Sequence, residues 1–298
     1  MFTRRSFMVG ATALSGSLAF GARGQAAPAD RLSTLSDGHL ELPADFLLPG
    51  VPAEARRELG IETGDGAMLS PPCNLTLHRS GDRLVLFDAG AGSNFMPSAG
   101  RLPDSLAEAG IDASEITDVI FTHAHPDHIW GVLDDFEDVA FPEAQFHVCR
   151  TEWDFWRSEA ALANIPEERQ NFVVGARGRF DAIEERTTLF DAGTEPVAGI
   201  EAMAAFGHTP GHCAFVLHGL DAPVMIVGDA IANDPVSFAR PDLLWGADQD
   251  AEAGAATRRR LLDRLAAEKL RFVGFHLPQG GIGRVETEGS HYRFVPGA

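Results

Sequence analysis

Short apolar runs along the chain alternate with turns that are rich in glycine, proline and aspartate. Residues 84–87 are apolar and β-favouring, and a glycine turn follows at residues 88–92, so we predict a buried strand that ends in a loop. Similar runs predict further strands at residues 119–121, 145–148, 215–217, 224–227 and 272–275, and a final hairpin through residues 289–294. Several of these runs end at a histidine or an aspartate, and loops at strand ends are where binding residues gather.

Segments of helical character separate the predicted strands. We expect helices at residues 103–109, 152–163, 167–183 and 251–270. Strands interleaved with helices predict a layered α/β fold. Because no repeat and no low-complexity linker interrupts the pattern, we predict one domain over residues 30–298.

The first 29 residues have the character of an export signal. Arg4 and Arg5 form a twin-arginine motif, residues 7–22 are weakly apolar, and Ala27-Pro28-Ala29 fits an A-x-A cleavage site. We interpret residues 1–29 as a signal peptide for the twin-arginine export machinery and expect a periplasmic protein. This route exports proteins that have already folded.

Composition and charge narrow the range of partners. The net charge of −19 argues against nucleic acid, because phosphate binding requires clustered cations. No apolar run reaches the roughly 18 residues of a membrane-spanning helix, so we expect no stable membrane anchor. The three cysteines lack a CxxC motif and make no disulfide framework, which leaves open a single pair in an oxidising compartment.

The strongest chemical signal is the HxHxDH segment at residues 123–128. It holds four candidate ligands directly after a predicted strand. In an extended loop His123 and His125 point the same way, because side chains alternate with a period of two, and Asp127 and His128 then face a second ion. Imidazole and carboxylate groups suit zinc and similar ions, so the segment predicts a metal site rather than a histidine-rich surface loop.

Three later segments add ligand candidates. His208 lies in the Gly/Pro-rich turn GHTPGH, Asp229 follows the strand at 224–227, and His276 follows the strand run that begins at residue 272. Taken singly, a histidine or aspartate at a strand end is more often a satisfied polar residue than a ligand. The four segments together, in this order, predict one metal centre.

HxHxDH, GHTPGH, the Gly-Asp pair and the late histidine resemble the metallo-β-lactamase superfamily over nearly all of the chain after the signal peptide. This resemblance implies an αββα sandwich, in which two packed sheets carry helices on both outer faces. Within the superfamily the chain looks most like the methyl parathion hydrolase family, because of AFP at residues 140–142, DFW at residues 154–156 and the C-terminal GIGR and YRFVP runs.

The resemblance also implies a ligand set for two divalent ions, with zinc expected. It assigns one ion to His123, His125 and His208, the other to Asp127, His128 and His276, and a bridging position to Asp229. His212 is expected to support the site rather than to bind metal, and Asp88 to support the ligand loop. The ligands alone do not separate zinc from iron, manganese or cobalt, since selection also depends on metal supply.

In such a centre a hydroxide that bridges the two ions attacks a hydrophobic ester, lactone or organophosphate triester, so no serine or cysteine nucleophile is required. Asp127 is the candidate catalytic residue, because its carboxylate is placed to accept a hydrogen bond from the hydroxide and to shuttle its proton. We therefore interpret the chain as an exported binuclear metal-dependent hydrolase with a small-molecule substrate. Relatives often dimerise, which suggests a homodimer.

Phe95, Trp156 and Phe172 match the substrate-pocket aromatics of the methyl parathion hydrolase family, and ordinary core packing is the alternative for each. An aromatic pocket favours hydrophobic substrates. The sequence departs from that family at Trp130, where the family has glycine, and we expect this side chain to narrow or reshape the site. Ala232 stands where N-acyl homoserine lactonases have tyrosine, which excludes their tyrosine-assisted mode but not lactone hydrolysis.

Two other functions stay open at this level. An iron-dependent oxidoreductase of the sulfur dioxygenase type has the same fold, but such enzymes use one iron and fewer ligands than the seven residues found here. A non-catalytic metal-binding protein is the second alternative. The presence of Asp127 in an intact ligand set argues against it, because a structural site needs no open, bridged pair of ions.

Overall fold

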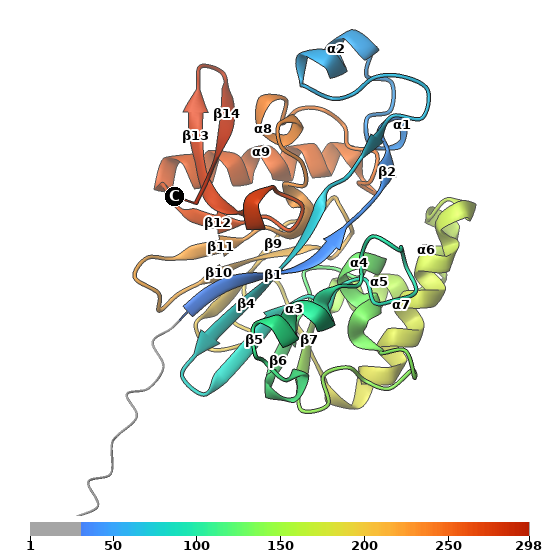
Figure 1. Ribbon diagram of the computed structural model, residues 1–298, viewed down its shortest axis with the longest axis vertical. Helices are drawn as coiled ribbons and strands as arrows, with labels where there is room; N and C mark the ends of the chain where they lie inside the picture. The colour runs from blue at the N-terminus through green and yellow to red at the C-terminus, as the bar shows by residue number, and fades with distance from the viewer. Residues whose placement is uncertain (1–30, 298) are drawn as a thin grey trace, which may run out of the picture.

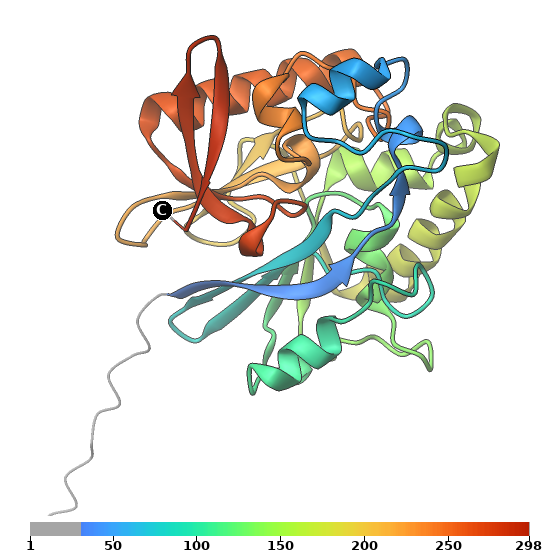
Figure 2. The same ribbon diagram turned by 45° about the horizontal axis from the view of Figure 1, so that its top comes forward.

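Two six-stranded sheets pack face to face, and helices cover the outer face of each (Figure 1, Figure 2). A computed structural model describes residues 31–297, so the expected signal peptide lies outside the described residues. The αββα arrangement implied by the sequence is confirmed. None of the described helices is long and apolar enough to span a membrane.

The first sheet provides the loops that carry the HxHxDH segment. Its strands, in spatial order, are β1 (Arg31–His39), β4 (Pro72–Ser80), β5 (Arg83–Phe87), β6 (Asp118–Ile120), β7 (Gln145–Cys149) and β8 (Thr187–Phe190). Its outer face packs on α3 (Leu102–Glu108), α4 (Pro126–Ile129), α5 (Arg150–Arg157), α6 (Glu159–Asn164) and α7 (Gln170–Ile183). The strands from β5 to β8 are parallel, so their carboxyl ends meet at one edge.

The second sheet carries the remaining candidate ligands. Its strands, in spatial order, are β14 (His291–Pro296), β13 (Ile282–Glu288), β12 (Arg271–Val273), β11 (Val224–Ile226), β10 (Cys213–Leu217) and β9 (Ile200–Ala204). The long helix α9 (Ala251–Glu268) connects the parallel strands β11 and β12 and covers the outer face together with α8 (Val236–Ala239). Asp250 starts α9 by accepting a hydrogen bond from the backbone N–H of Ala253, which satisfies an otherwise unpaired donor.

Shorter elements complete the described chain. The small sheet of β2 (Leu42–Pro43) and β3 (Met68–Leu69) lies with α1 (Ala44–Leu47) and α2 (Ala53–Glu58) in an excursion of the chain between β1 and β4. The short 3-10 turns are η1 (Ala113–Glu115), η2 (Trp130–Val132), η3 (Glu167–Arg169), η4 (Glu184–Arg186), η5 (Gly228–Ala230) and η6 (Gln279–Gly281).

The predicted strands are all present, but the sequence patterns missed others. β4 was missed because Asn74, Thr76 and His78 interrupt its apolar run, although all three side chains are buried. Asn74 uses its amide to donate hydrogen bonds of 2.8 Å to the carbonyls of Phe275 and Leu277, which joins the two sheets. β1, β8 and β9 were not predicted either.

One helix prediction was wrong. The segment 152–163 contains two helices, α5 and α6, because Ser158 between them has extended backbone angles and its hydroxyl donates to the carbonyl of Phe155. This local bond competes with the helical pattern, as serine side chains often do. The three cysteines are buried and free.

Phe215 of β10 connects the two sheets through the central core. Its ring is fully buried and lies 5.4 Å from the ring of Phe87 and 5.9 Å from that of Phe190, both on the first sheet. We expect Phe215→Ala to lower the free energy of unfolding by about 3–5 kcal/mol, because it leaves a cavity between the sheets. Urea denaturation followed by circular dichroism measures the change.

Phe136 provides the control for this substitution. Its side chain is 84% exposed, so Phe136→Ala should change the stability by no more than about 0.5 kcal/mol. Equal losses in the two variants would contradict the assignment of Phe215 to the shared core.

Candidate metal centre

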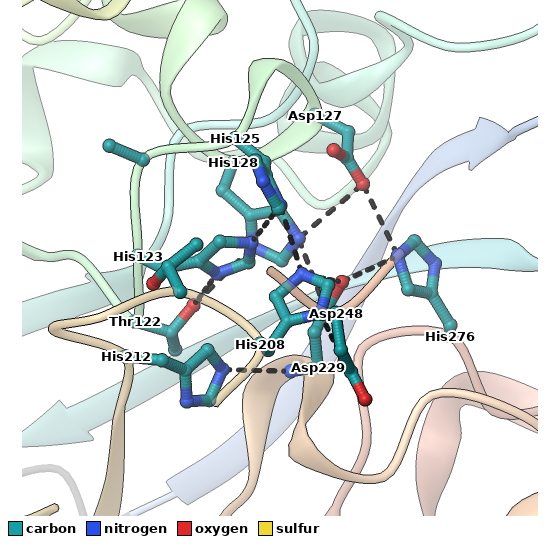
Figure 3. A network of polar contacts seen from close by, with 12 residues as sticks. Thr122, His123, His125, Asp127, His128, His208, His212, Asp229, Asp248 and His276 are labelled. Atoms are coloured by element: carbon teal, nitrogen blue, oxygen red, sulfur yellow. Dashed lines mark hydrogen bonds and ion pairs between the residues drawn. The ribbon is translucent and has the colours of Figure 1, made fainter. Parts of the chain in front are cut away.

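The candidate metal centre lies where loops from both sheets meet at one edge of the sandwich (Figure 3). The HxHxDH segment follows β6, GHTPGH connects β9 to β10, Asp229 follows β11, and His276 follows β12. The structure brings together all seven residues for which the sequence predicted a metal-binding role. They form two groups, and every one of them is buried.

The first group consists of His123, His125 and His208. The Nδ1 atom of His125 lies 3.0 Å from Nε2 of His123 and 2.9 Å from Nε2 of His208. Burial and the neighbouring histidines hold the pKa of His123 and of His125 well below the ordinary value. These imidazoles are therefore neutral, and neutral imidazole is the form that binds a metal ion.

The second group consists of Asp127, His128, Asp229 and His276. Nε2 of His276 lies 3.2 Å from Oδ2 of Asp127 and 3.3 Å from Oδ2 of Asp229, and Nε2 of His128 lies 3.3 Å from Oδ1 of Asp229. Nδ1 of His276 is 2.8 Å from the carbonyl of Pro72, which fixes that nitrogen as the donor and leaves Nε2 for a ligand bond.

Asp229 links the two groups. Its Oδ2 atom lies 3.3 Å from Nε2 of His208 in the first group and 3.3 Å from Nε2 of His276 in the second. Burial opposes its ionisation, but the surrounding histidines outweigh that effect and hold its pKa well below the usual range. A single carboxylate thus touches both groups, as a residue that bridges two ions must.

Unpaired polar atoms show that the residues fit metal ions. Asp127 Oδ2, His128 Nε2 and Asp229 Oδ1 are buried and lie 3.2–3.4 Å from other atoms of the second group, but none of the three makes a hydrogen bond of good geometry. Buried polar atoms are nearly always paired, so three orphans within one cluster require an explanation. Divalent ions supply it, and the two groups of histidine and aspartate support two such ions.

Asp88 supports the HxHxDH loop, as the sequence predicted. Its carboxylate accepts hydrogen bonds from the backbone N–H of Thr122 at 2.7 Å and from the Thr122 hydroxyl, and it lies 2.9 Å from Nδ1 of His128. This contact orients the His128 ring with Nε2 toward the second group. The backbone of Asp88 is left-handed, with φ of 66°, at the turn where β5 ends.

His212 does not belong to either group. Its Nε2 atom accepts a hydrogen bond of 3.0 Å from the backbone N–H of Asp229, so that nitrogen faces the protein backbone. The expectation that His212 supports the site rather than binds metal is confirmed by this contact. It positions the turn that carries Asp229.

Two further supporting carboxylates were missed by the sequence analysis. Asp248 lies 3.0 Å from Nδ1 of His208 and accepts a hydrogen bond of 2.9 Å from the buried guanidinium of Arg258. Glu152 accepts four hydrogen bonds, three of which connect the HxHxDH loop with the GHTPGH turn. Its donors are the backbone N–H groups of Ala124 and Gly211, the hydroxyl of Thr209 and the indole of Trp156.

A cavity of about 260 Å³ opens onto Asp127, Asp229 and His276 of the second group and onto His125 and His208 of the first. Phe95 and Phe172, two of the predicted pocket aromatics, line it together with apolar residues of the β1–α1 region, which are Leu40, Leu42, Phe46 and Leu47. The structure corrects the place of Trp156, which is fully buried behind His125, at a ring distance of 5.7 Å, and donates to Glu152 instead of lining the cavity.

Trp130 lies behind the cavity wall and does not line the cavity. Its ring contacts Phe95 at 5.6 Å and Phe172 at 6.4 Å, and the guanidinium of Arg179 lies 4.9 Å from it. On α7 the ring occupies the space beside Gly175, where an added Cβ would come within 2.6 Å of the indole. Trp130 therefore supports the aromatic wall from outside rather than narrowing the site directly.

The sequence profile of the metallo-β-lactamase superfamily matches residues 71–274. The chain belongs to the metallo-β-lactamase superfamily. The matched range contains every residue of the two groups except His276, which follows two residues later. Among curated protein sequences, none matches the chain.

Solved structures of superfamily members resemble the chain over most of its length. AidC, a dizinc quorum-quenching lactonase in complex with the product N-hexanoyl-L-homoserine, is 28% identical, with a TM-score of 0.82 over 92% of this chain and 96% of AidC. The hydrolase AbOPH is 26% identical, with a TM-score of 0.81 over 91% of this chain and 95% of AbOPH. A probable metal-dependent hydrolase from Staphylococcus aureus, 18% identical with a TM-score of 0.73 over 91% of this chain and 98% of its own, shares the fold.

Asp248 should set the metal affinity of the first group. We expect Asp248→Asn to weaken metal binding by about 10–100-fold, because the supporting carboxylate that orients His208 is lost. Competition with a chromophoric chelator measures the dissociation constants. Asp242→Asn is the control, since that carboxylate forms a half-exposed pair with Arg240, and an equal effect there would count against a specific role of Asp248.

Gly175 and Trp130 should be coupled in stability. Alanine is normally better than glycine in a helix by about 1 kcal/mol, and Gly178→Ala, with open space around it, should show that gain. Gly175→Ala should instead destabilise by about 1–3 kcal/mol, because the new methyl group meets the indole. In a Trp130→Ala background, Gly175→Ala should no longer lower the free energy of unfolding. If Gly175→Ala stabilises the protein while Trp130 is present, the packing of the indole on Gly175 is contradicted.

Proposed function

We propose that this protein is a binuclear metal-dependent hydrolase of hydrophobic esters or lactones. The observation that carries the proposal is the position of Asp229, which contacts both groups of candidate ligands at the base of an apolar cavity. A structural metal site is closed by its ligands, whereas a catalytic site keeps a position open to substrate. Here five of the seven proposed ligands line the cavity, namely His125, Asp127, His208, Asp229 and His276.

His123, His125 and His208 would hold one ion, Asp127, His128 and His276 the other, and Asp229 both. Divalent ions in such a centre supply Lewis acidity, which lowers the pKa of water and stabilises negative charge on the oxygen of the scissile group. Zinc is the proposed metal, because histidine and carboxylate ligands suit it.

Asp127 is the proposed catalytic residue. Its Oδ2 atom is without a hydrogen-bond partner, and its carboxylate lines the cavity. The neighbouring histidines outweigh the effect of burial and hold its pKa below the usual range, so the carboxylate is ionised and can accept a hydrogen bond from the attacking water. No serine or cysteine nucleophile is needed for this chemistry.

The cavity favours a small substrate with an apolar part, since leucine and phenylalanine side chains dominate its wall. The similarity to AidC supports a lactone or a related carboxylic ester. Ala232 lines the cavity, and Tyr292, the only tyrosine of the chain, lies on β14 and donates to Asp263. Tyrosine assistance is therefore absent from the proposed mechanism. Organophosphate triesters, suggested by the resemblance to the methyl parathion hydrolase family, are the second substrate class that we propose to test.

We also propose that the protein works in the periplasm after export by the twin-arginine machinery. The Arg4-Arg5 motif and the following weakly apolar segment support this location. A fusion of residues 1–30 to a reporter that is active only after folded export tests the signal, with Arg4→Lys/Arg5→Lys as the control that should retain the reporter in the cytoplasm.

The function is tested by metal analysis combined with hydrolysis assays on the purified protein. We expect about two zinc ions per chain and hydrolysis of p-nitrophenyl acetate or of a homoserine lactone, with methyl parathion as the phosphotriester arm. His123→Ala should lose metal and activity together, and chelation should abolish the activity until zinc is restored. Asp127→Asn removes a proposed ligand as well as the proton acceptor, so it is assayed with excess zinc and with its metal content measured; at full zinc occupancy it should turn over slowly.

His218→Ala is the matched control for these variants, because His218 is half exposed and pairs with Glu201 on the surface. It should keep both metal and activity. One iron per chain, oxygen uptake and no hydrolysis of any of the three substrates would instead establish an oxidoreductase of the sulfur dioxygenase type. Full activity in Asp127→Asn would remove the proton-shuttle role from Asp127.

A further inference from the structure

Arg169 is a cation in the wall of an otherwise mainly apolar cavity. It lies at the end of η3, directly before α7, and lines the same cavity as His125, Asp127 and His276. Its side chain is half buried, and burial lowers the pKa of its guanidinium from the ordinary value. An arginine nevertheless remains charged in a protein, so a positive charge faces the space that a substrate would occupy.

The guanidinium of Arg169 forms no ion pair or hydrogen bond within the described residues 31–297. The neighbouring Glu168 also lines the cavity and acts on Arg169 by its charge, raising the pKa of the guanidinium against the effect of burial, but its exposed carboxylate makes no ion-pair contact with it. By contrast, the buried Arg258 binds Asp248, and the half-buried Arg177 donates to the carbonyls of Trp156 and Ser158, while Arg179, outside the cavity, stacks on Trp130. Arg169 therefore keeps its hydrogen-bond donors available.

Phe46 holds the arginine in place without satisfying these donors. The guanidinium carbon of Arg169 lies over the Phe46 ring, 5.1 Å from its centre. A phenyl ring has no oxygen or nitrogen acceptor, so this contact leaves the N–H groups of the guanidinium without a conventional hydrogen-bond partner. The contact also reduces the conformational freedom of the side chain, which prepares it to bind a ligand.

We propose that Arg169 binds a carboxylate of the substrate, at a point separate from the bond that is hydrolysed. A carboxylate fits because its two oxygens match the fork of N–H donors and because it neutralises a partly desolvated cation. The inference rests on the hydrolase function proposed above and narrows its substrate class. The substrates are small esters or lactones that carry an acid group on an apolar chain, such as half-esters of dicarboxylic acids.

Binding of unreactive acids tests this assignment without turnover. Straight-chain dicarboxylates from succinate to suberate are titrated calorimetrically into the metal-loaded protein, each against the monocarboxylate of equal length. One carboxylate of either ligand can occupy the metal centre, and only the dicarboxylate has a second group for Arg169. At the chain length that fits, we expect the dicarboxylate to bind roughly tenfold or more tightly than the monocarboxylate, as a charge-assisted hydrogen bond provides.

Arg169→Met should abolish this preference and leave the affinity for monocarboxylates unchanged, because methionine preserves the apolar stem against Phe46. Arg169→Lys should retain part of the preference, since it keeps the charge and loses the fork. Arg284→Met is the matched control, because Arg284 is exposed on β13, and it should bind as the wild type does. Metal content measured in each variant separates a binding effect from loss of the metal centre.

The wild type showing no preference at any chain length, or the preference surviving in Arg169→Met, would overturn the assignment. The proposed function is judged separately by hydrolysis. If no ester or lactone is hydrolysed but the preference depends on Arg169, the hydrolase function fails and the carboxylate site stands. If esters are hydrolysed and half-esters gain nothing from Arg169, the function stands and this inference fails.

Discussion

The buried carboxylate of Glu152 is the contact on which the metal centre depends. Through one oxygen it binds the backbone of Ala124 in the HxHxDH loop, and through the other it binds Thr209 and Gly211 in the GHTPGH turn. Burial raises the pKa of this carboxyl group, and the hydrogen bonds act against that effect. Because the two loops come from different sheets, their candidate ligands would have no fixed separation without a link of this kind.

Asp88 and Asp248 extend the same principle to individual rings. Asp88 lies 2.9 Å from Nδ1 of His128, and Asp248 lies 3.0 Å from Nδ1 of His208. In each ring the opposite nitrogen, Nε2, is therefore turned toward the proposed ions. When no ion is bound, the buried ligand atoms that make no hydrogen bond lower the free energy of unfolding, because their desolvation is not compensated. The supporting carboxylates hold that crowded arrangement in place before metal arrives, which is the geometry that rapid and selective binding requires.

The sequence predicted those parts of the site that are local, and missed those made by folding. HxHxDH is visible because its ligands are consecutive, and Asp229 and His276 because each follows an apolar strand. Glu152 and Asp248 gave no signal, since their partners lie up to 59 residues away and a carboxylate in a helix or loop looks like any surface acid. Trp156 was predicted to line the cavity for the same reason. The sequence shows only that the residue is aromatic, whereas its burial depends on a hydrogen bond from the indole N–H to Glu152, which only the fold creates. Asn74 helped to hide the core strand β4, because its polar side chain is buried with its amide bonded to carbonyls that follow β12 of the other sheet.

The aromatic wall shows how packing outside the site can shape selectivity within it. Trp130 fills a volume that is free only because residue 175 of α7 has no side chain. The ring of Trp130 then supports Phe95 and Phe172, which line the cavity, and Phe172 in turn lies 6.3 Å from the ring of His125. A change of volume at this position is therefore transmitted to the substrate wall through contacts between rigid rings, because close-packed side chains transmit strain. Asp88, Glu152 and Asp248 support the candidate metal ligands, whereas Trp130 supports the cavity wall, so a substitution of Trp130 alters the wall without removing a contact that orients a ligand.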